Sequence, residues 1–116
     1  MRLSILAATG AAMFASAAWA ADYPSRPIRM IVPQAPGSAS DNVARLIAAQ
    51  LAQQLKQQVV VDNRPGGALM IGMELTAKAP PDGYTIGYGP IGALAISPNI
   101  VRGTIALDVQ KDLQPV

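Results

Sequence analysis

Apolar positions between residues 28 and 62 first follow a strand-like pattern, then a helical one, then a strand-like one again. The run from Ile28 to Val32 is short, mostly apolar and closed by Pro33, which predicts a buried strand. Apolar residues then recur at spacings of three and four among Gln and Lys, which predicts an amphipathic helix ending near Lys56. A β-branched strand follows at 59–62. The apolar face of the helix is predicted to comprise Val43, Leu46, Ile47, Leu51 and Leu55.

The pattern then repeats once more. Residues 63–67 read Asn-Arg-Pro-Gly-Gly, which interrupts any regular element. A second helix is predicted over about 68–79, with Ile71, Leu75 and Met70 facing inward, and Pro80 and Pro81 end it. A turn at 82–83 leads into a third strand at 84–88.

Strands joined by single helices predict parallel pairing with right-handed crossovers. The fold class is therefore α/β, a parallel βαβαβ unit whose helices cover a layered sheet. After Ile96 the pattern loosens into Ser97-Pro98-Asn99, and no closing element is predicted before Val116. The unit is expected to be incomplete.

The first twenty residues carry a cation, Arg2, then an apolar run rich in alanine, and end in Ala18-Trp19-Ala20. This is the pattern of a signal peptide with an Ala-x-Ala cleavage site, and the run is short of the roughly 20 strongly apolar residues that a membrane span needs. We expect residues 1–20 to be removed and residues 21–116 to be exported.

Charge and cysteine content narrow the classes of function. Without the first twenty residues the chain keeps eight basic and seven acidic side chains, which leaves no basic face for nucleic acid. The chain has no cysteine, so the fold is expected to depend on its apolar core rather than on disulfides. It has no histidine and no clustered carboxylates that would form a metal site or an acid–base pair.

Three glycine-containing loops follow the three predicted strands, at 34–41, 63–68 and 88–92. In an open parallel sheet, the ligand crevice lies beyond the carboxyl ends of the strands. Two of the loops lead into helix N-termini, where unpaired N–H groups and the helix dipole favour an anion such as a carboxylate. Ser38 and Asp41 are expected to cap the first helix.

Other interpretations of these loops stay open. Any single glycine-containing loop can be only a tight turn, Arg64 can be a solvated side chain, and Asp41 can brace its loop rather than act as a base. Nucleotide binding is disfavoured, since residues 36–41 match neither Gly-x-Gly-x-x-Gly nor a phosphate loop with Gly-Lys-Ser/Thr.

Several separated motifs resemble the periplasmic receptors of tripartite tricarboxylate transporters, also called Bug-type binding proteins. They cover essentially all of the chain after residue 22, in order. They are the run at 23–33, Asp41 with Ala44-Arg45, the run at 59–66, Ala77-Lys78-Ala79, the run at 82–85, the run at 95–98, and Asp108 with the run at 111–116.

The resemblance implies a two-domain receptor of the periplasmic binding protein type II class, about three times this length, of which residues 21–116 are the N-terminal part of the first domain. It implies a periplasmic, non-enzymatic protein that uses no cofactor, captures a small carboxylate and delivers it to membrane transporter subunits. The substrate-binding residues implied are Gln34, Ala35, Gly37, Ser38, Ala39, Ser40, Asp41, Gly66, Gly67, Tyr88, Gly89 and Gly92.

The chain departs from the family pattern at two loops, so the resemblance does not identify which ligand it binds. Gln34 stands where an aromatic residue is usual, and Gly37-Ser38 where a Gly-Gly pair is usual. Ala68-Leu69-Met70 replaces a stretch that commonly holds two more glycines and an asparagine. Two other functions remain: an exported α/β enzyme with catalytic residues beyond Val116, and a subunit that senses a solute for a membrane partner.

Overall fold

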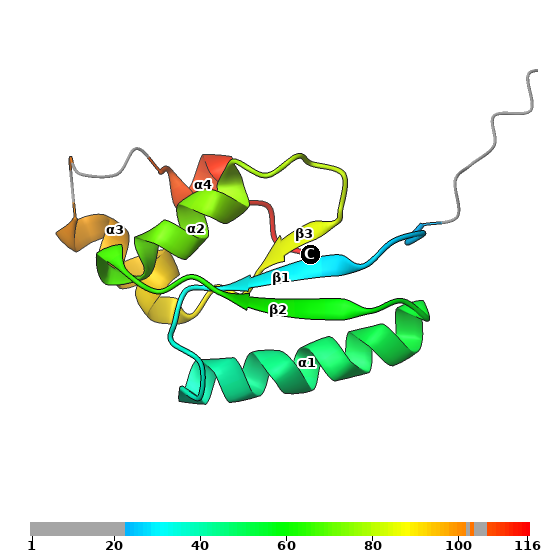
Figure 1. The fold of residues 1–116 in the computed structure, drawn as a ribbon. Helices are drawn as coiled ribbons and strands as arrows, with labels where there is room; N and C mark the ends of the chain where they lie inside the picture. Colours follow the sequence, from blue (N-terminus) through cyan, green and yellow to red (C-terminus); the bar gives the residue numbers. More distant parts are fainter. Residues whose placement is uncertain (1–22, 102, 104–106) are drawn as a thin grey trace, which may run out of the picture.

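The computed structural model describes residues 23–101, 103 and 107–116, and the predicted signal peptide lies outside them. Three strands, β1 (Ile28–Val32), β2 (Val59–Asn63) and β3 (Thr85–Gly87), form one sheet in the order β2-β1-β3. Both pairings are parallel, with Ile28 opposite Val59 and Arg29 opposite Thr85. The predicted parallel βαβαβ unit is confirmed (Figure 1).

One long helix, α1 (Ala39–Leu55), covers one face of the sheet, and α2 (Met70–Ala77) lies on the opposite face (Figure 1). Crossover connections place helices on the faces of a parallel sheet, so both faces of such a sheet are usually covered. On the α1 face, Met30 and Val32 of β1 pack with Ala44 and Ala48, and all four side chains are buried. This cluster is the centre of the core.

The helix α1 lies where the pattern predicts it, but its predicted inward face is only partly right: Leu51 packs against the core and Leu55 is partly buried, while the other three residues are exposed. Val43, Leu46 and Ile47 are 44%, 70% and 41% exposed, whereas Ala44 and Ala48 are buried against the sheet. Alanine has no side chain beyond Cβ, so the helix packs with its backbone close to the strands. The larger apolar side chains then lie on the flanks of that contact.

The predicted inward face of the second helix is also only partly right, since it is confirmed for Met70 alone. Met70 and Met73 are buried, but Ile71 and Leu75 are 43% and 40% exposed. A Cβ added to Gly72 would lie 2.9 Å from the Cα of Pro33, so this glycine lets α2 approach the loop after β1. The face of α2 that lies against the sheet therefore contains Met70, Gly72 and Met73, rather than the branched residues around them.

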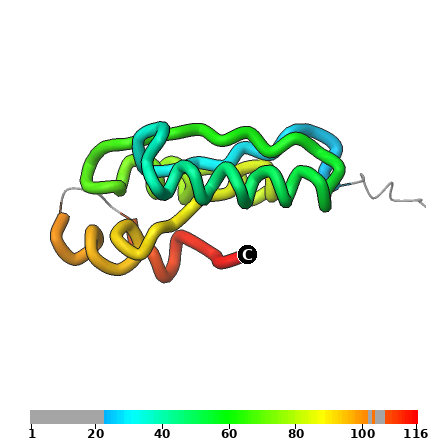
Figure 2. Tube along the Cα trace, turned by 90° about the horizontal axis from the view of Figure 1, so that it is seen from below, coloured from blue at the N-terminus to red at the C-terminus, as the bar shows by residue number. Residues whose placement is uncertain are grey.

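Residues 92–100 are helical, whereas the sequence predicted a loop up to Gly92 and no regular element after Ile96. A π-helical segment, η2 (Gly92–Ile96), continues into α3 (Ser97–Ile100), and a short helix, α4 (Val109–Asp112), lies close to the end of the chain. Ala93 and Ser97, four residues apart, are buried and mark the packed side of this segment. Figure 2 shows the chain after β3 lying to one side of the sheet and α1.

At the opposite end of the sheet from the loops, an aromatic contact holds the segment before β1. The rings of Tyr23 and Tyr84 meet edge to face at 5.1 Å, and the Arg26 guanidinium lies 4.2 Å from the centroid of the Tyr84 ring. Arg26 also pairs with Asp82 at 2.8 Å. Within the described part of the chain, no helix is long and apolar enough to cross a membrane.

Candidate functional site

The three glycine-containing loops begin at the same edge of the sheet, as predicted. Val32, the last residue of β1, is opposite Asn63, the last residue of β2, and Ile31 is opposite Gly87 at the end of β3. The Arg64 N–H donates to the carbonyl of Val32 at 2.8 Å, so the paths of the first two loops stay together past the strands. This edge is the place where α/β sheets bind ligands.

The loop after β1 is held by hydrogen bonds of its own. Ser38 caps α1, and its Oγ accepts a hydrogen bond from the Asp41 N–H at 3.2 Å. The carboxylate of Asp41 reaches back and its Oδ2 accepts the Gly37 N–H at 2.8 Å. The capping pair is confirmed, except that the carboxylate binds the N–H before the cap instead of the N–H of the cap itself. Gly37 has a φ of +81°, a conformation that favours glycine.

Asp41 accepts three hydrogen bonds through its carboxylate and is only 2% exposed. The Arg45 Nε donates to its Oδ2 at 3.0 Å, and the Asn63 Nδ2 donates to its Oδ1 at 2.9 Å. Hydrogen bonds from Arg45, from the Gly37 N–H and from Asn63 lower the pKa of Asp41 to about 2. Asp41 is therefore ionised at neutral pH and braces the loop; a role as general base would need a much higher pKa.

Asn63 joins this loop to the second strand, and sequence reasoning missed it. Besides its bond to Asp41, its Nδ2 donates to the Gln34 carbonyl at 3.0 Å, and its Oδ1 accepts from Arg45 Nη2 at 3.3 Å. The spacing of four between Asp41 and Arg45 was a detectable signal on a helix. No local pattern in the sequence signals Asn63, because its partners Asp41 and Gln34 lie 22 and 29 residues away.

The hydrogen bonds also decide which N–H groups of the first loop are free. Gly37 and Ser38 both use theirs inside the loop, Gly37 with Asp41 and Ser38 with the Ala35 carbonyl at 3.2 Å. The Ala39 and Ser40 N–H groups, in the first turn of α1, have no hydrogen-bond acceptor within the described part of the chain. They are the donors that remain for an anion at this end of the helix. The Oε1 of Gln34 is also buried without a hydrogen-bond partner among the described residues.

Four consecutive residues after β2 have positive φ, although two of them, Ala68 and Leu69, are not glycine. Gly66 and Gly67 have φ values of +119° and +56°, and Ala68 and Leu69 follow at +51° and +74°. These four residues lead through the 3-10 turn η1 (Gly67–Leu69) into α2. Positive φ costs a residue with a Cβ about 1–2 kcal/mol, so this loop stores backbone strain next to the edge where the loops meet.

The third loop lies beside the second. A Cβ added to Gly92 would lie 3.3 Å from the Leu69 side chain, and the Tyr88 N–H donates to the Ile31 carbonyl at 2.8 Å. The Tyr88 ring is partly buried against the core under α1. The structure thus brings all three predicted loops together, while contact of their residues with a ligand stays a prediction.

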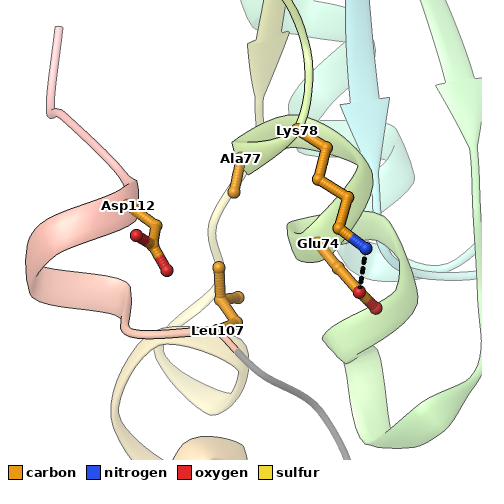
Figure 3. A pocket seen from close by; sticks show the side chains of 5 residues that line it. All are labelled: Glu74, Ala77, Lys78, Leu107 and Asp112. Atoms are coloured by element: carbon orange, nitrogen blue, oxygen red, sulfur yellow. Dashed lines mark hydrogen bonds and ion pairs between the residues drawn. The ribbon is translucent and has the colours of Figure 1, made fainter.

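Two cavities in the described part of the chain have charged side chains in their linings. One, of about 410 Å³, lies between α2 and α4 and is lined by the Glu74–Lys78 ion pair together with Ala77, Leu107 and Asp112 (Figure 3). The other, of about 450 Å³, lies along β1 and β2 beside Arg29 and Asp62 and reaches Arg64 in the loop after β2. Burial raises the pKa of Asp62, but the hydrogen bonds from Arg29 and Arg64 outweigh burial and hold it below its usual value. The ion pairs in both cavities already satisfy most of their charged groups, so neither cavity is assigned as the site.

A parallel α/β sheet with glycine-containing loops and a helix N-terminus gathered at its carboxyl edge is typical of the class of α/β proteins that bind ligands at that edge. Solved structures narrow that class. The chain matches "MatC (Rpa3494) from Rhodopseudomonas palustris with bound malate" with a TM-score of 0.71 and 32% identity, over 78% of this chain and 30% of that one. It matches "Structure of periplasmic binding protein BugD" with a TM-score of 0.55 and 46% identity, over 56% and 22%. The fold is that of periplasmic binding proteins.

The chain belongs to the tripartite tricarboxylate transporter family of receptors, and the match to that family covers residues 43–116. It is 42% identical over 115 residues to a UPF0065 protein of Bordetella bronchiseptica, covering 99% of this chain and 34% of that protein. The chain thus spans about a third of the length of this relative. The family resemblance inferred from the separated motifs is confirmed.

Proposed function

We propose that this chain supplies one wall of the ligand cleft of an extracytoplasmic solute-binding receptor, which captures a small organic acid for a tripartite tricarboxylate-type secondary transporter. The observation that carries the proposal lies at the edge where the three loops meet. There the N–H groups of Ala39 and Ser40 have no hydrogen-bond acceptor among the described residues. Membership of the receptor family and similarity to a protein with bound malate support a carboxylate as the ligand.

In this proposal the binding is done by backbone rather than by charged side chains. The N–H groups of the first turn of α1 carry the positive end of the helix dipole, and they can donate to a carboxylate without a paired cation. Ser38, Ser40 and Asp41 shape the loop, while residues 66–67 and 88–92 border the same cleft. Membrane subunits of the transporter are the proposed partners, and no step of chemical catalysis is involved.

Testing the proposal requires a second wall for the cleft. Residues 21–116 would be fused, where the alignment ends, to the remainder of the malate-bound receptor. Once a cooperative melt shows that the chimera folds, calorimetry should detect saturable binding of malate. The neutral diamide of malate, which keeps the shape but removes both charges, should bind at least about tenfold more weakly if charge-assisted hydrogen bonds hold the carboxylate. A folded chimera that binds neither compound, or both equally, would contradict the proposal.

Export is the second part of the proposal. The sequence of residues 1–20 supports a cleaved signal peptide, and family membership supports a periplasmic location. Expressed with its native start in a Gram-negative host, the protein should be recovered outside the cytoplasm with Ala21 as its first residue. N-terminal sequencing measures this directly, and recovery of uncleaved protein in the membrane fraction would contradict it.

A further inference from the structure

Asn63 links the loop after β1 to the end of β2, where the second loop of the candidate site begins. It ends β2 opposite Val32, the last residue of β1, and its side chain bonds to groups on the α1 side of the sheet. There its amide reaches three groups: the carbonyl of Gln34, the carboxylate of Asp41 and the guanidinium of Arg45. Among the described residues, no other side chain is hydrogen-bonded to both ends of the loop 34–41.

Two of these bonds, to Gln34 and to Asp41, restrain different parts of that loop. The bond to the Gln34 carbonyl restrains the first residue of the loop. The bond to Asp41 Oδ1 restrains its last residue, whose other carboxylate oxygen, Oδ2, accepts the Gly37 N–H. The two carboxylate oxygens are thereby divided, Oδ1 for the strand and Oδ2 for the loop and Arg45. Since Asp41 is almost fully buried, removing one donor leaves a buried charge less well paired.

We infer that Asn63 is a positioning residue: it sets the conformation of the loop 34–41 from β2, and so aims the free Ala39 and Ser40 N–H groups at the ligand. The ligand in this inference comes from the proposed function, whereas the effect of Asn63 on the conformation of the loop does not depend on that function. A ligand bound by fixed backbone donors gains affinity from their preorganisation, because the loop then loses little freedom on binding. Loosening the loop should weaken binding while leaving the core beneath α1 in place.

The test uses the malate-binding chimera and compares three variants. Asn63→Ala removes the amide. Asn63→Asp keeps its shape but replaces the donor to Asp41 with a second carboxylate. Asn42→Ala is the matched control, since it truncates an exposed asparagine in the first turn of α1 whose side chain makes no hydrogen bond within the described part of the chain. Two readouts are needed, amide hydrogen exchange of residues 34–41 and malate affinity, together with the melting temperature.

We expect Asn63→Ala to speed exchange at the Gly37 and Ser38 amides and to weaken malate binding by about tenfold, the equivalent of one lost hydrogen bond to a charged group. Asn63→Asp should weaken it further, and Asn42→Ala should change neither readout. Unchanged exchange and affinity in Asn63→Ala would overturn the inference. So would a fall in melting temperature with accelerated exchange across the whole sheet, which would make Asn63 a general structural residue.

The outcomes separate this inference from the proposed function. If the parent chimera folds but does not bind malate, while Asn63→Ala still frees the Gly37 amide, the proposed function fails and the loop-setting role stands. If the parent binds malate and Asn63→Ala binds it equally well, the proposed function stands and the positioning role fails.

Discussion

At the scale of single residues, the state of Asp41 decides how the first loop is held. Its carboxylate is buried, yet hydrogen bonds from Arg45, the Gly37 N–H and Asn63 stabilise the charged form and lower its pKa to about 2. Because this pKa lies below the ordinary value of 3.8, Asp41 contributes stability that is fully present above about pH 4. That contribution is lost as the pH falls through about 2.

Replacing Arg45 should shift this titration. In Arg45→Gln the largest of the stabilising interactions is weakened, so the pKa of Asp41 should rise from about 2 toward 3.8 and the loop should loosen at a higher pH. A carbon-13 NMR titration of the Asp41 carboxyl in the chimera measures the midpoint. Arg64→Gln is the control, because Arg64 pairs with Asp62 instead. Equal midpoints for Asp41 in the parent and in Arg45→Gln would show that Arg45 does not hold the charge.

Gly37 provides a second prediction at the same scale. A Cβ there meets nothing within 4 Å, so a larger residue is opposed by the backbone φ of +81° rather than by a collision within the protein. Gly37→Val should therefore displace the loop and weaken malate binding by calorimetry, with a nearly unchanged melting temperature. Gly37→Asn also adds a side chain but tolerates the left-handed conformation, so it should weaken binding less. Equal affinity of the parent and Gly37→Val would remove this loop from the site.

At the scale of elements, the turn into α2 carries strain that the strands and helices do not. Ala68 and Leu69 hold left-handed conformations, with φ values of +51° and +74°, which residues that carry a Cβ rarely adopt. The neighbouring residues Gly66 and Gly67 adopt positive φ without that cost.

Relieving this strain should stabilise the protein. Ala68→Gly removes the Cβ at a φ of +51° and should raise the free energy of unfolding by about 1 kcal/mol, as the relief of left-handed strain exceeds the added flexibility of the unfolded chain. The same change in a regular helix, Ala77→Gly at the end of α2, should lower it by up to about 1 kcal/mol. Urea unfolding of both chimeras gives the two values. A destabilised Ala68→Gly would mean that the turn is not strained.

At the scale of the whole molecule, residues 21–116 leave much apolar surface uncovered. Three strands with two crossover helices bury a small core, while large apolar side chains stay more than half exposed on α1, η2 and α3. Both outer strands of the three-stranded sheet, β2 and β3, have an edge that pairs with no other described strand. The most exposed large apolar side chains within the described elements are Leu46, Ile96 and Ile100.

We therefore expect residues 21–116 alone to be molten or self-associating and to bind no dicarboxylate. A domain of this size buries roughly 60% of its unfolded surface and is marginal, and the second wall that would enclose a ligand is absent from these residues. Near-UV circular dichroism, sedimentation and a malate titration of the purified segment measure the three properties. A cooperative melt together with saturable malate binding would contradict the expectation.

The kind and order of the elements up to β3 were predictable from the sequence, because local periodicity and turn residues decide them. No helix was predicted over residues 92–100, yet glycine and proline there do not prevent a helix whose small residues Ala93 and Ser97 pack inward. The meeting of the three loops was also predictable, because parallel strands end at one edge.

Only the tertiary structure decided which faces are buried and how the first loop is held. Three of the five apolar residues predicted to face inward on α1 lie beside its contact face, since alanines at 44 and 48 allow the closer approach to the sheet. Asn63 and Asp41 became partners because the register places the end of β2 beside the start of α1, a relation between residues 22 positions apart. Periodicity acts over one or two turns of chain, whereas strand register and packing set the contacts between distant segments, and those contacts build this site.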